Sequence, residues 1–467
     1  MARINTNISA LIAQRNLNHA YRSLNTTMEH LSTGLRISRG KDDPAGLIIS
    51  ERLRGEIAAV GQAISNTQRA SLIISTTEGA LDEVASLLKD IQAKIVEAAN
   101  RGAMSDDEVR ANQLQIDQAI DSITRIANTT SFGGRRLLDG SLQYTTSGVD
   151  TRYVAAYHVH AAQFGESTAI PVRVSVINQA SRATRGFPFA VLSAPVTIEV
   201  SGRLGTTSLS FGSGTSVSQV AQAIADVRSA TGVSATVSGG SGLRVDSLGY
   251  GSKEFVRIKI LSGGGGLTDG NASGQDALAT VNGALAQADG NHLAVKTASL
   301  DIELDITDTF AAGRTSTFTI TGGGALFQVG PHVNTNLQVN LGVQSVAASN
   351  LGDPVVGYLA TIKTGGPNSL TTGKFAEASR IVEKAIDQIS VLRGRLGSFE
   401  RGTLDANSNQ LSITMENLVS AESSIRDADF AKETSELARS QILVSAGTTV
   451  LTLANQTTQS VLRLLGS

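Results

Sequence analysis

The chain has 467 residues, which is enough for about two to four domains. Its 39 basic and 41 acidic residues give a formal net charge of −2, and this balance argues against a surface that binds nucleic acid or an anionic membrane. The absence of cysteine excludes disulfides and thiolate chemistry, so packing alone must stabilise the fold.

The N-terminal part of the chain carries hydrophobic repeats of helical period. A 4-3-4-3-4 spacing, typical of a coiled-coil seam, runs through Leu17, Tyr21, Leu24, Met28, Leu31 and Leu35. Asp43 followed by Pro44 predicts the capped start of a second helix, in which the spacing recurs at Leu81, Val84, Leu88, Ile91, Ile95 and Ala98. Ser105 and Glu108 predict the capped start of a third helix, which ends near Gly133.

The centre of the chain, residues 141–373, is rich in glycine and predicts β-structure. It holds 32 of the 47 glycines, whereas Pro44 is the one proline before it and none follows. Alternating apolar residues predict strands at 172–176, 196–200, 205–211, 233–237 and 255–261. A short helix at 217–227 turns the last four of these into a β-β-α-β-β unit. Further strands are predicted at 300–306 and 317–320, and a hairpin over 326–343 leads back to the helical part.

Helical repeats return at the C-terminal end. One seam comprises Phe375, Ala378, Val382, Ala385, Ile389, Leu392, Leu396 and Phe399. The last series comprises Phe430, Thr434, Leu437, Gln441, Val444, Thr448, Leu451, Asn455, Thr458, Leu462 and Leu465. Its apolar stripe is too wide for a single partner, so this helix is expected to meet several neighbours.

The final helix is almost free of charge, since Arg463 is the one charged residue after Ser440. Uncharged polar faces suit packing in an assembly or the lining of a water-filled bore. The alternative, a helix buried in a monomeric core, would leave many polar groups in need of partners. Polar residues interrupt the apolar stretch 442–465, so no membrane-spanning helix is predicted. The first eight residues also lack the pattern of a secretory signal peptide.

No catalytic, cofactor-binding or metal-binding constellation is predicted. The six histidines show no His-Glu-x-x-His spacing and have no cysteine partners. His158 and His160 are interpreted as a surface pair on one side of a strand. Asp301, Glu303 and Asp305 alternate with apolar residues and are interpreted as a solvated strand face.

Motifs at both ends of the chain closely resemble bacterial flagellin. At the start these are INTNISAL (4–11), LSTGLRISRGKDDPAGL (31–47), NTQRA (66–70) and TEGAL (77–81). Near the end they are LRGRLGSF (392–399), IRDADFA (425–431), ARSQI (438–442), ANQ (454–456) and VLRLL (461–465). The resemblance covers roughly the first 140 and the last 100 residues. Residues 196–261 resemble an insertion module of some flagellins and hook-associated proteins.

The resemblance implies an α+β fold, in which long antiparallel terminal helices form a coiled-coil or helical-bundle stem with a β-hairpin, and a β-rich outer domain is inserted. We expect an inner coiled-coil domain from 1–43 and 425–467, a helical stem with the hairpin from 44–163 and 325–424, and a surface-exposed variable domain from 164–324. The inner domain is expected to pack through Leu17, Tyr21, Leu24, Met28, Leu31, Leu35, Phe430, Leu437, Val444, Leu451 and Leu465. The stem is expected to pack through Leu81, Leu88, Ile95, Val382, Ile389, Leu396 and Phe399.

The resemblance further implies a structural subunit that polymerises into the bacterial flagellar filament for swimming motility. It implies an extracellular location, type III export without a cleaved signal peptide, and no cofactor. The implied partners are other copies of the chain, an export chaperone on the C-terminal helix, the hook–filament junction proteins and the filament cap. Because ordering a chain costs about 1–2 kcal/mol per residue, the terminal helices are expected to order only on assembly.

One role of the family is expected to be weak here. Where some flagellins present an arginine, a leucine and a glutamate to an animal innate receptor, this chain carries Asp90, Lys94 and Gln115. A reversed charge and the loss of an apolar anchor predict poor receptor activation.

Two alternatives are open. The first is a hook–filament junction protein, which shares related termini. The second is a secreted enzyme carried on a filament scaffold, which would need a catalytic constellation within residues 164–324.

Overall fold

The computed structural model describes residues 6–165, 167–239, 242–354 and 356–465, and the side chains of the last helix as far as residue 456. The chain divides into two compact units, which are considered separately. Unit 1 takes the described residues of 1–67, 330–332 and 406–467, and unit 2 takes those of 68–329 and 333–405.

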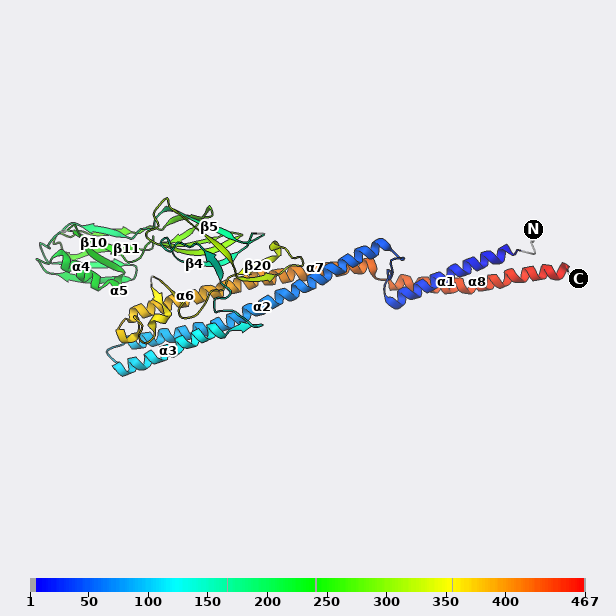
Figure 1. The fold of residues 1–467 in the computed structure, drawn as a ribbon, viewed down its shortest axis with the longest axis horizontal. Coiled ribbons are helices and arrows are strands. Elements are labelled where there is room, and N and C mark those ends of the chain that lie inside the picture. Colours follow the sequence, from blue (N-terminus) through cyan, green and yellow to red (C-terminus); the bar gives the residue numbers. More distant parts are fainter. Residues whose placement is uncertain (1–5, 166, 240–241, 355, 466–467) are drawn as a thin grey trace. The chain divides into compact units, whose positions relative to one another are not determined.

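The helices lie mainly at the two ends of the sequence (Figure 1). They are α1 (Ile8–Thr33), α2 (Pro44–Ala99), α3 (Asp106–Thr129), α4 (Val217–Asp226), α5 (Arg228–Thr231), α6 (Phe375–Phe399), α7 (Ala406–Arg426) and α8 (Phe430–Leu465). A π-helical segment, Glu400–Asp405, joins α6 to α7. Short 3-10 turns lie at Thr335–Leu337, Leu359–Ile362 and Leu370–Thr372.

The starts of α2 and α3 follow the capping signals of the sequence. α2 begins at Pro44, and the Asp43 carboxylate accepts a hydrogen bond of 2.9 Å from the N–H of Gly46. Ser105 and Glu108 form a reciprocal capping box at the start of α3. Both predicted helix starts are therefore confirmed.

α1 ends earlier than its hydrophobic repeat suggests. Gly34 adopts a left-handed conformation with φ of 71°, and its N–H donates to the carbonyl of His30, which closes the helix. Leu35 therefore lies outside α1, and the predicted seam is wrong at this position.

Unit 1 contains two helix contacts. α1 and α8 run side by side (Figure 1). The first part of α2 packs on α7 through a small cluster made by Val60, Ala63 and Leu411, with Met415 and Leu418 against it.

The stem of unit 2 is a bundle formed by the rest of α2 with α3 and α6. Its hydrophobic core is continuous with the residues that follow the β-hairpin, such as Val343 and Val346. Among the predicted stem residues, Phe399 packs against this core and the others lie buried within it: Leu81, Leu88, Ile95, Val382, Ile389 and Leu396. Their burial places the predicted seams of α2 and α6 face to face.

The strands of unit 2 form antiparallel sheets. They are β1 (Ser131–Phe132), β2 (Arg135–Arg136), β3 (Tyr144–Ser147), β4 (Val154–Ala162), β5 (Ile170–Asn178), β6 (Thr184–Phe187), β7 (Val196–Gly202), β8 (Gly205–Phe211), β9 (Val233–Ser238), β10 (Gly242–Ser247), β11 (Phe255–Gly263), β12 (Gly270–Ser273), β13 (Leu278–Val281), β14 (Ala284–Leu285), β15 (Gln287–Asp289), β16 (His292–Lys296), β17 (Leu300–Ile306), β18 (Thr315–Gly323), β19 (Ala325–Gln328), β20 (Gln338–Leu341), β21 (Gly352–Asp353) and β22 (Gly357–Tyr358).

A first lobe is built from the sheets β14-β13-β5-β18-β3 and β15-β16-β17-β4. Val172 and Val174 of β5, Ile302 and Leu304 of β17, and Phe318 of β18 meet in its core. Tyr144 and Val154 also belong to this core, so β3 and β4 pack with the outer β-structure. The division that we expect at residue 163 stays a prediction, but it falls behind two strands of this lobe.

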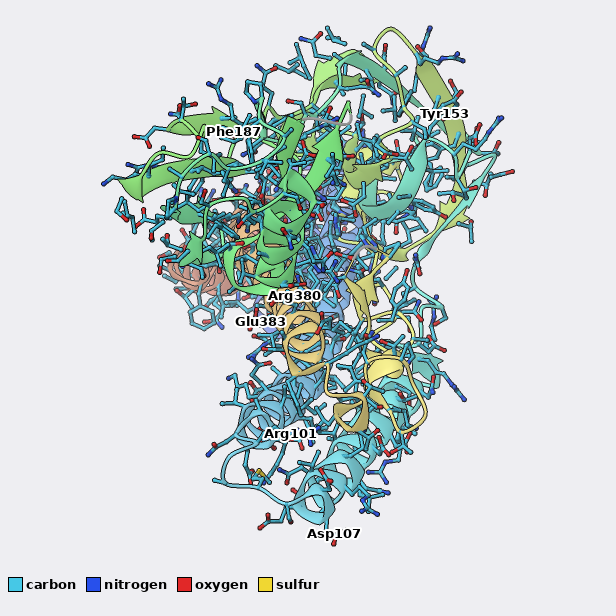
Figure 2. The ribbon with its side chains drawn as sticks, turned by 90° about the vertical axis from the view of Figure 1, so that its left-hand side faces the viewer. Arg101, Asp107, Tyr153, Phe187, Arg380 and Glu383 are labelled. Atoms are coloured by element: carbon cyan, nitrogen blue, oxygen red, sulfur yellow. The ribbon has the colours of Figure 1, made fainter. Side chains whose placement is uncertain are left out.

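A second lobe is built from the sheets β12-β11-β7-β8 and β6-β10-β9 with α4. It has a hydrophobic core of its own, so the outer structure contains two cores rather than one. Tyr153 of the first lobe and Phe187 of the second mark the two bodies in Figure 2. The four strands and the helix of the predicted β-β-α-β-β unit are all present, whereas β10 was not predicted because Leu243 and Val245 are its only apolar residues.

The predicted hairpin is formed by β19 and β20, which pair from Ala325 to Leu341. Helical ends, a hairpin and an inserted β-region together confirm the predicted α+β fold.

We expect Leu88→Ala to destabilise the stem by about 2–5 kcal/mol, because Leu88 is fully buried in the three-helix core and its loss leaves a cavity. The chain has several cores and need not unfold in one step, so the measurement is the denaturant midpoint of the helical far-UV signal. Leu114→Ala on α3, where the side chain is 63% exposed, is the control and should change stability by less than about 0.5 kcal/mol. Equal midpoints for the two variants would contradict this core.

Candidate assembly surface

α1 and α8 meet along a seam in which small residues alternate with larger ones. On α1 the seam passes through Ala13, Leu17, Ala20, Leu24, Thr27 and Leu31, and the three small residues are the buried ones. On α8 it passes through Glu433, Leu437, Ser440, Val444, Gly447, Leu451 and Ala454, with Ser440 fully buried. Both series have the 4-3-4-3 spacing of a coiled coil.

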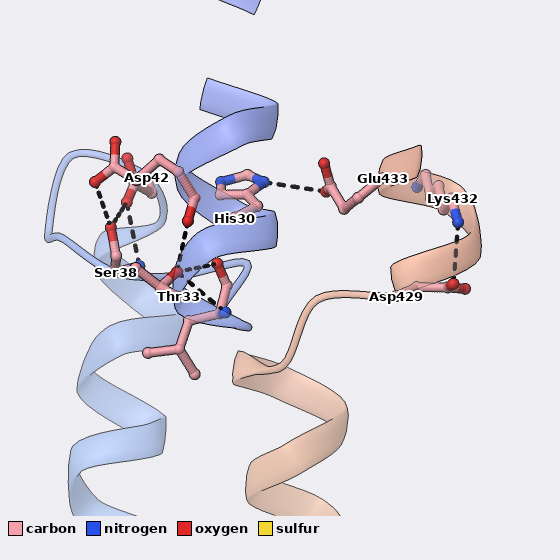
Figure 3. Close-up of polar contacts among 9 residues, drawn as sticks. His30, Thr33, Ser38, Asp42, Asp429, Lys432 and Glu433 are labelled. Carbon is pink, nitrogen blue, oxygen red and sulfur yellow. Dashed lines mark hydrogen bonds and ion pairs between the residues drawn. The ribbon is translucent and has the colours of Figure 1, made fainter. Parts of the chain in front are cut away.

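Contacts along the seam show that the two helices are antiparallel. The Asn7 side chain donates to the carbonyl of Ala454 at 2.9 Å near one end. His30 and Glu433 lie 3.0 Å apart near the other end (Figure 3).

Gly447 marks a close approach of the two helices. A Cβ added to Gly447 would lie 3.0 Å from Cδ1 of Leu17. Ser23 and Ser440 also come within 3.3 Å of each other across the same seam. The small residues therefore let the helices approach closely.

The observed seam differs from the predicted one. Leu17, Leu24 and Leu31 lie half-buried in it, and so do their α8 counterparts Leu437, Val444 and Leu451. Tyr21, Met28 and Phe430 do not, since they are 43%, 55% and 69% exposed. The prediction that these three face α8 is wrong, because Ala20 and Thr27 take the seam positions on α1. Leu465 lies beyond the described side chains.

Large apolar side chains remain uncovered on both helices of this pair. These side chains are 43–69% exposed and comprise Ile8, Leu11, Ile12, Tyr21, Met28, Phe430, Ile442, Leu443, Val450 and Leu453. Such a contiguous apolar surface is typical of an interface with further chains.

A joint connects α1 to α2 and α7 to α8, and it is made largely of main-chain contacts. The N–H of Arg36 donates to the carbonyl of Arg426 at 2.7 Å, and the N–H of Ala428 donates to the carbonyl of Gly34 at 2.9 Å. Leu35 and Asp427 form an antiparallel β-bridge between them. Two segments far apart in the sequence are thereby tied together.

Charged side chains close the joint. The Arg426 guanidinium, 13% exposed, lies 2.9 Å from the Glu51 carboxylate, and this hydrogen bond holds the pKa of Glu51 below its usual value. Asp42 accepts hydrogen bonds from the N–H groups of Arg39 and Ser38, which lowers the pKa of its carboxyl group (Figure 3). These carboxylates are therefore charged at neutral pH, as their contacts require.

The three positions compared with the innate-receptor contacts come together on the stem. Asp90, Lys94 and Gln115 line one hollow of about 410 Å³ between α2 and α3, with Ile91 and Ile116 beside them. The Lys94 ammonium group lies 2.8 Å from the carboxylate of Glu97. The hollow is therefore flanked by charge where an apolar anchor would be needed.

Two interpretations of polar residues in the first lobe are wrong. His160 is 8% exposed and therefore does not form a surface pair with His158. Asp301 and Glu303 are not solvated, because both contact Arg395 of α6. The alternation of polar and apolar residues predicted the strand, but the helix that covers its polar face comes much later in the chain.

Within the described residues, no group of three or more His, Asp or Glu side chains is placed to hold a metal ion. Over the same part of the chain, each helix falls short of the length or apolarity that crossing a membrane would require.

A helical pair that leaves its large apolar side chains uncovered is typical of a structural subunit completed by assembly. Residues 4–143 match the family model described as the bacterial flagellin N-terminal helical region, and residues 379–465 match that of the C-terminal helical region. Polar flagellin F of Vibrio parahaemolyticus is 30% identical over 465 residues, which span 99% of each chain. B-type flagellin of Pseudomonas aeruginosa is 29% identical over 524 aligned positions, again spanning 99% of each chain.

The chain therefore belongs to the flagellin family, and its function is that of a flagellar filament subunit. Among solved structures, FliC of Burkholderia pseudomallei aligns at 14% identity over 71% of this chain and 99% of that chain. Its TM-score of 0.24 is too low to support an argument.

We expect Gly46→Ala to loosen the joint, because the new Cβ would lie 2.5 Å from the Asp43 carboxylate that caps α2 and 2.7 Å from Cδ1 of the buried Ile37. Gly55→Ala in the same helix is the matched control. Its Cβ meets open space, and the better helix propensity of alanine should stabilise α2 by up to about 1 kcal/mol. The measurement is hydrogen exchange of residues 34–47 in assembled protein. Faster exchange is expected for Gly46→Ala alone, and equal exchange in both variants would refute the close packing.

Proposed function

We propose that the subunit joins its filament through the uncovered apolar residues of α1 and α8. The observation that carries this proposal is their exposure, 43–69% for ten large side chains on one helix pair. Burying such a side chain fully contributes about 1.5–3 kcal/mol, so several neighbouring subunits acting together supply a large driving force. Contacts between different faces of identical chains do not close into a ring and give a helical polymer.

We also propose that unit 1 orders as it assembles. The 26 residues of α1 and the 36 residues of α8 each cost about 1–2 kcal/mol to order. The seam between them buries mainly alanine, serine, threonine and glycine, which contribute little hydrophobic free energy. The outward apolar residues must therefore be covered before ordering becomes favourable.

The remaining partners and the location are proposals of the same kind. An export chaperone would cover the apolar residues of α8 before assembly, and the junction proteins and the filament cap would meet the same helices at the two ends of the filament. An extracellular filament reached by type III export without a cleaved signal peptide fits such a chain. Flagellins are structural proteins, and we propose no catalytic role. Similarity to flagellins over the full length favours a filament subunit over a hook–filament junction protein.

Ile442→Asp should raise the critical concentration for polymerisation at least about tenfold. Ile442 is 68% exposed on α8, and an unpaired carboxylate buried by a neighbouring subunit costs several kcal/mol. The measurement is seeded polymerisation followed by sedimentation and electron microscopy. Leu285→Asp on β14, at 65% exposure, is the matched control and should polymerise normally. Normal assembly of Ile442→Asp would overturn the proposed surface.

We further propose that the chain engages the animal innate receptor weakly, because Asp90, Lys94 and Gln115 replace the family's contact residues in one hollow. Changing them together by Asp90→Arg, Lys94→Leu and Gln115→Glu should lower the protein concentration needed for half-maximal signalling at least about tenfold. The measurement uses purified lipid-free protein on receptor-bearing reporter cells. Lys89→Leu, outside the hollow, is the control and should change nothing. Strong signalling by the unaltered chain would refute the proposal.

A further inference from the structure

The first lobe faces the stem helix α6 through a polar interface within unit 2. The sheet β15-β16-β17-β4 presents its apolar face to the core of the lobe, as Leu293, Ile302 and Leu304 show. Its other face surrounds a cavity of about 210 Å³ shared with α6. α6 carries Arg380 and Glu383 nearer its start, where Figure 2 labels them. The polar contact lies further along, from Lys384 to Arg395.

Histidines and carboxylates alternate across the strands of this face. In the strand register His292 lies opposite Asp305, and His158 lies opposite Glu303. His292 Nδ1 is 2.7 Å from Asp305 Oδ1, and His160 Nε2 is 3.5 Å from Glu303 Oε2. Both pairs become ion pairs when the imidazole is protonated.

α6 contributes the permanent cations that hold the sheet. The Arg395 guanidinium contacts Glu303 and lies 3.4 Å from Asp301. Lys384 lies 3.5 Å from Asp353 of β21. Because these side chains are half-buried rather than fully exposed, their charges are only partly screened by water.

The charges around the cavity do not balance while the histidines are neutral. The carboxylates are Asp301, Glu303, Asp305, Asp353 and Asp387, and the permanent cations are Lys384, Arg395 and, at the edge of β16, Lys296. Acidic groups therefore outnumber permanent cations, and protonated His158, His160 or His292 would supply the missing positive charge.

We propose that this cluster is a pH-sensitive latch, which holds the first lobe against α6 while its histidines are protonated and loosens as they lose their protons. The stem itself would not open, because α6 keeps its hydrophobic contacts with α2 and α3 on its other face. The link between β4 and the chain after β20, in which the N–H of Gly342 donates to the carbonyl of His160 at 2.8 Å, would remain as a pivot.

The direction of the pH effect follows from the individual groups. The hydrogen bond to Asp305 raises the pKa of His292, so its stabilisation is complete below the ordinary histidine value of 6.5 and is lost as the pH rises through the raised pKa. Contact with His160 lowers the pKa of Glu303 to about 2, so this carboxylate stays charged until the medium is strongly acidic. Burial, and then the neighbouring His160, lowers the pKa of His158. His158 therefore opposes the latch as the pH falls below 6.5.

The test is hydrogen exchange of the full-length protein at about pH 5.5 and about pH 8.5, values chosen to lie on either side of histidine titration, with intrinsic exchange rates corrected. Peptides from β4, β16 and β17 should lose about two- to fivefold of their protection at the higher pH, the range expected for a partly exposed charge pair. Peptides from α3, which lie in the stem core, should not change and serve as an internal check on folding.

Three variants separate the latch from a general effect of pH. His292→Asn should abolish most of the pH dependence, whereas His19→Asn, on α1 in unit 1, should leave it intact. Arg395→Gln should lower the protection of β17 at both pH values, because it removes the permanent tether. Equal protection at the two pH values in the unaltered chain, or full pH dependence in His292→Asn, would overturn the proposal, and so would an equal loss throughout unit 2.

Discussion

The rest of this molecule depends on how two helices share one seam. A pair of helices can bury only one face of each, and α1 and α8 use that face for alanine, threonine, serine and glycine alternating with leucine and valine. Their larger apolar side chains point elsewhere. A single chain thus has no means of covering them, and unit 1 is an incomplete structure whose missing parts are other copies of itself.

Unit 2 solves the same problem within one chain. Three helices, α2, α3 and α6, enclose a core of fully buried leucine, isoleucine and valine, and each β-lobe adds a core of its own. This unit has what it needs to fold before assembly. The chain therefore combines a part that can be stable alone with a part whose stability is tied to subunit concentration.

The sequence predicted most of the fold, because caps and periodicity are local signals. The starts of α2 and α3 are determined by Asp43, Pro44, Ser105 and Glu108, which lie next to the residues that they cap. The seam of α1 was only partly predicted. Ala20 and Thr27 matter because they are small, whereas a count of apolar residues favours Tyr21 and Met28.

The remaining errors concern partners that are distant in sequence. Arg36 meets Arg426, and Glu303 meets Arg395, through folding alone, and no local pattern of residues indicates either pair. The joint has a mechanical consequence of this kind. Its bridge between Leu35 and Asp427 fastens the incoming and outgoing strands to each other by main-chain hydrogen bonds, so tension applied to either terminal helix is divided between both strands before it reaches α2 or α7. Because main-chain groups form this cross-link, side chains around it can vary in related chains while the division of force persists.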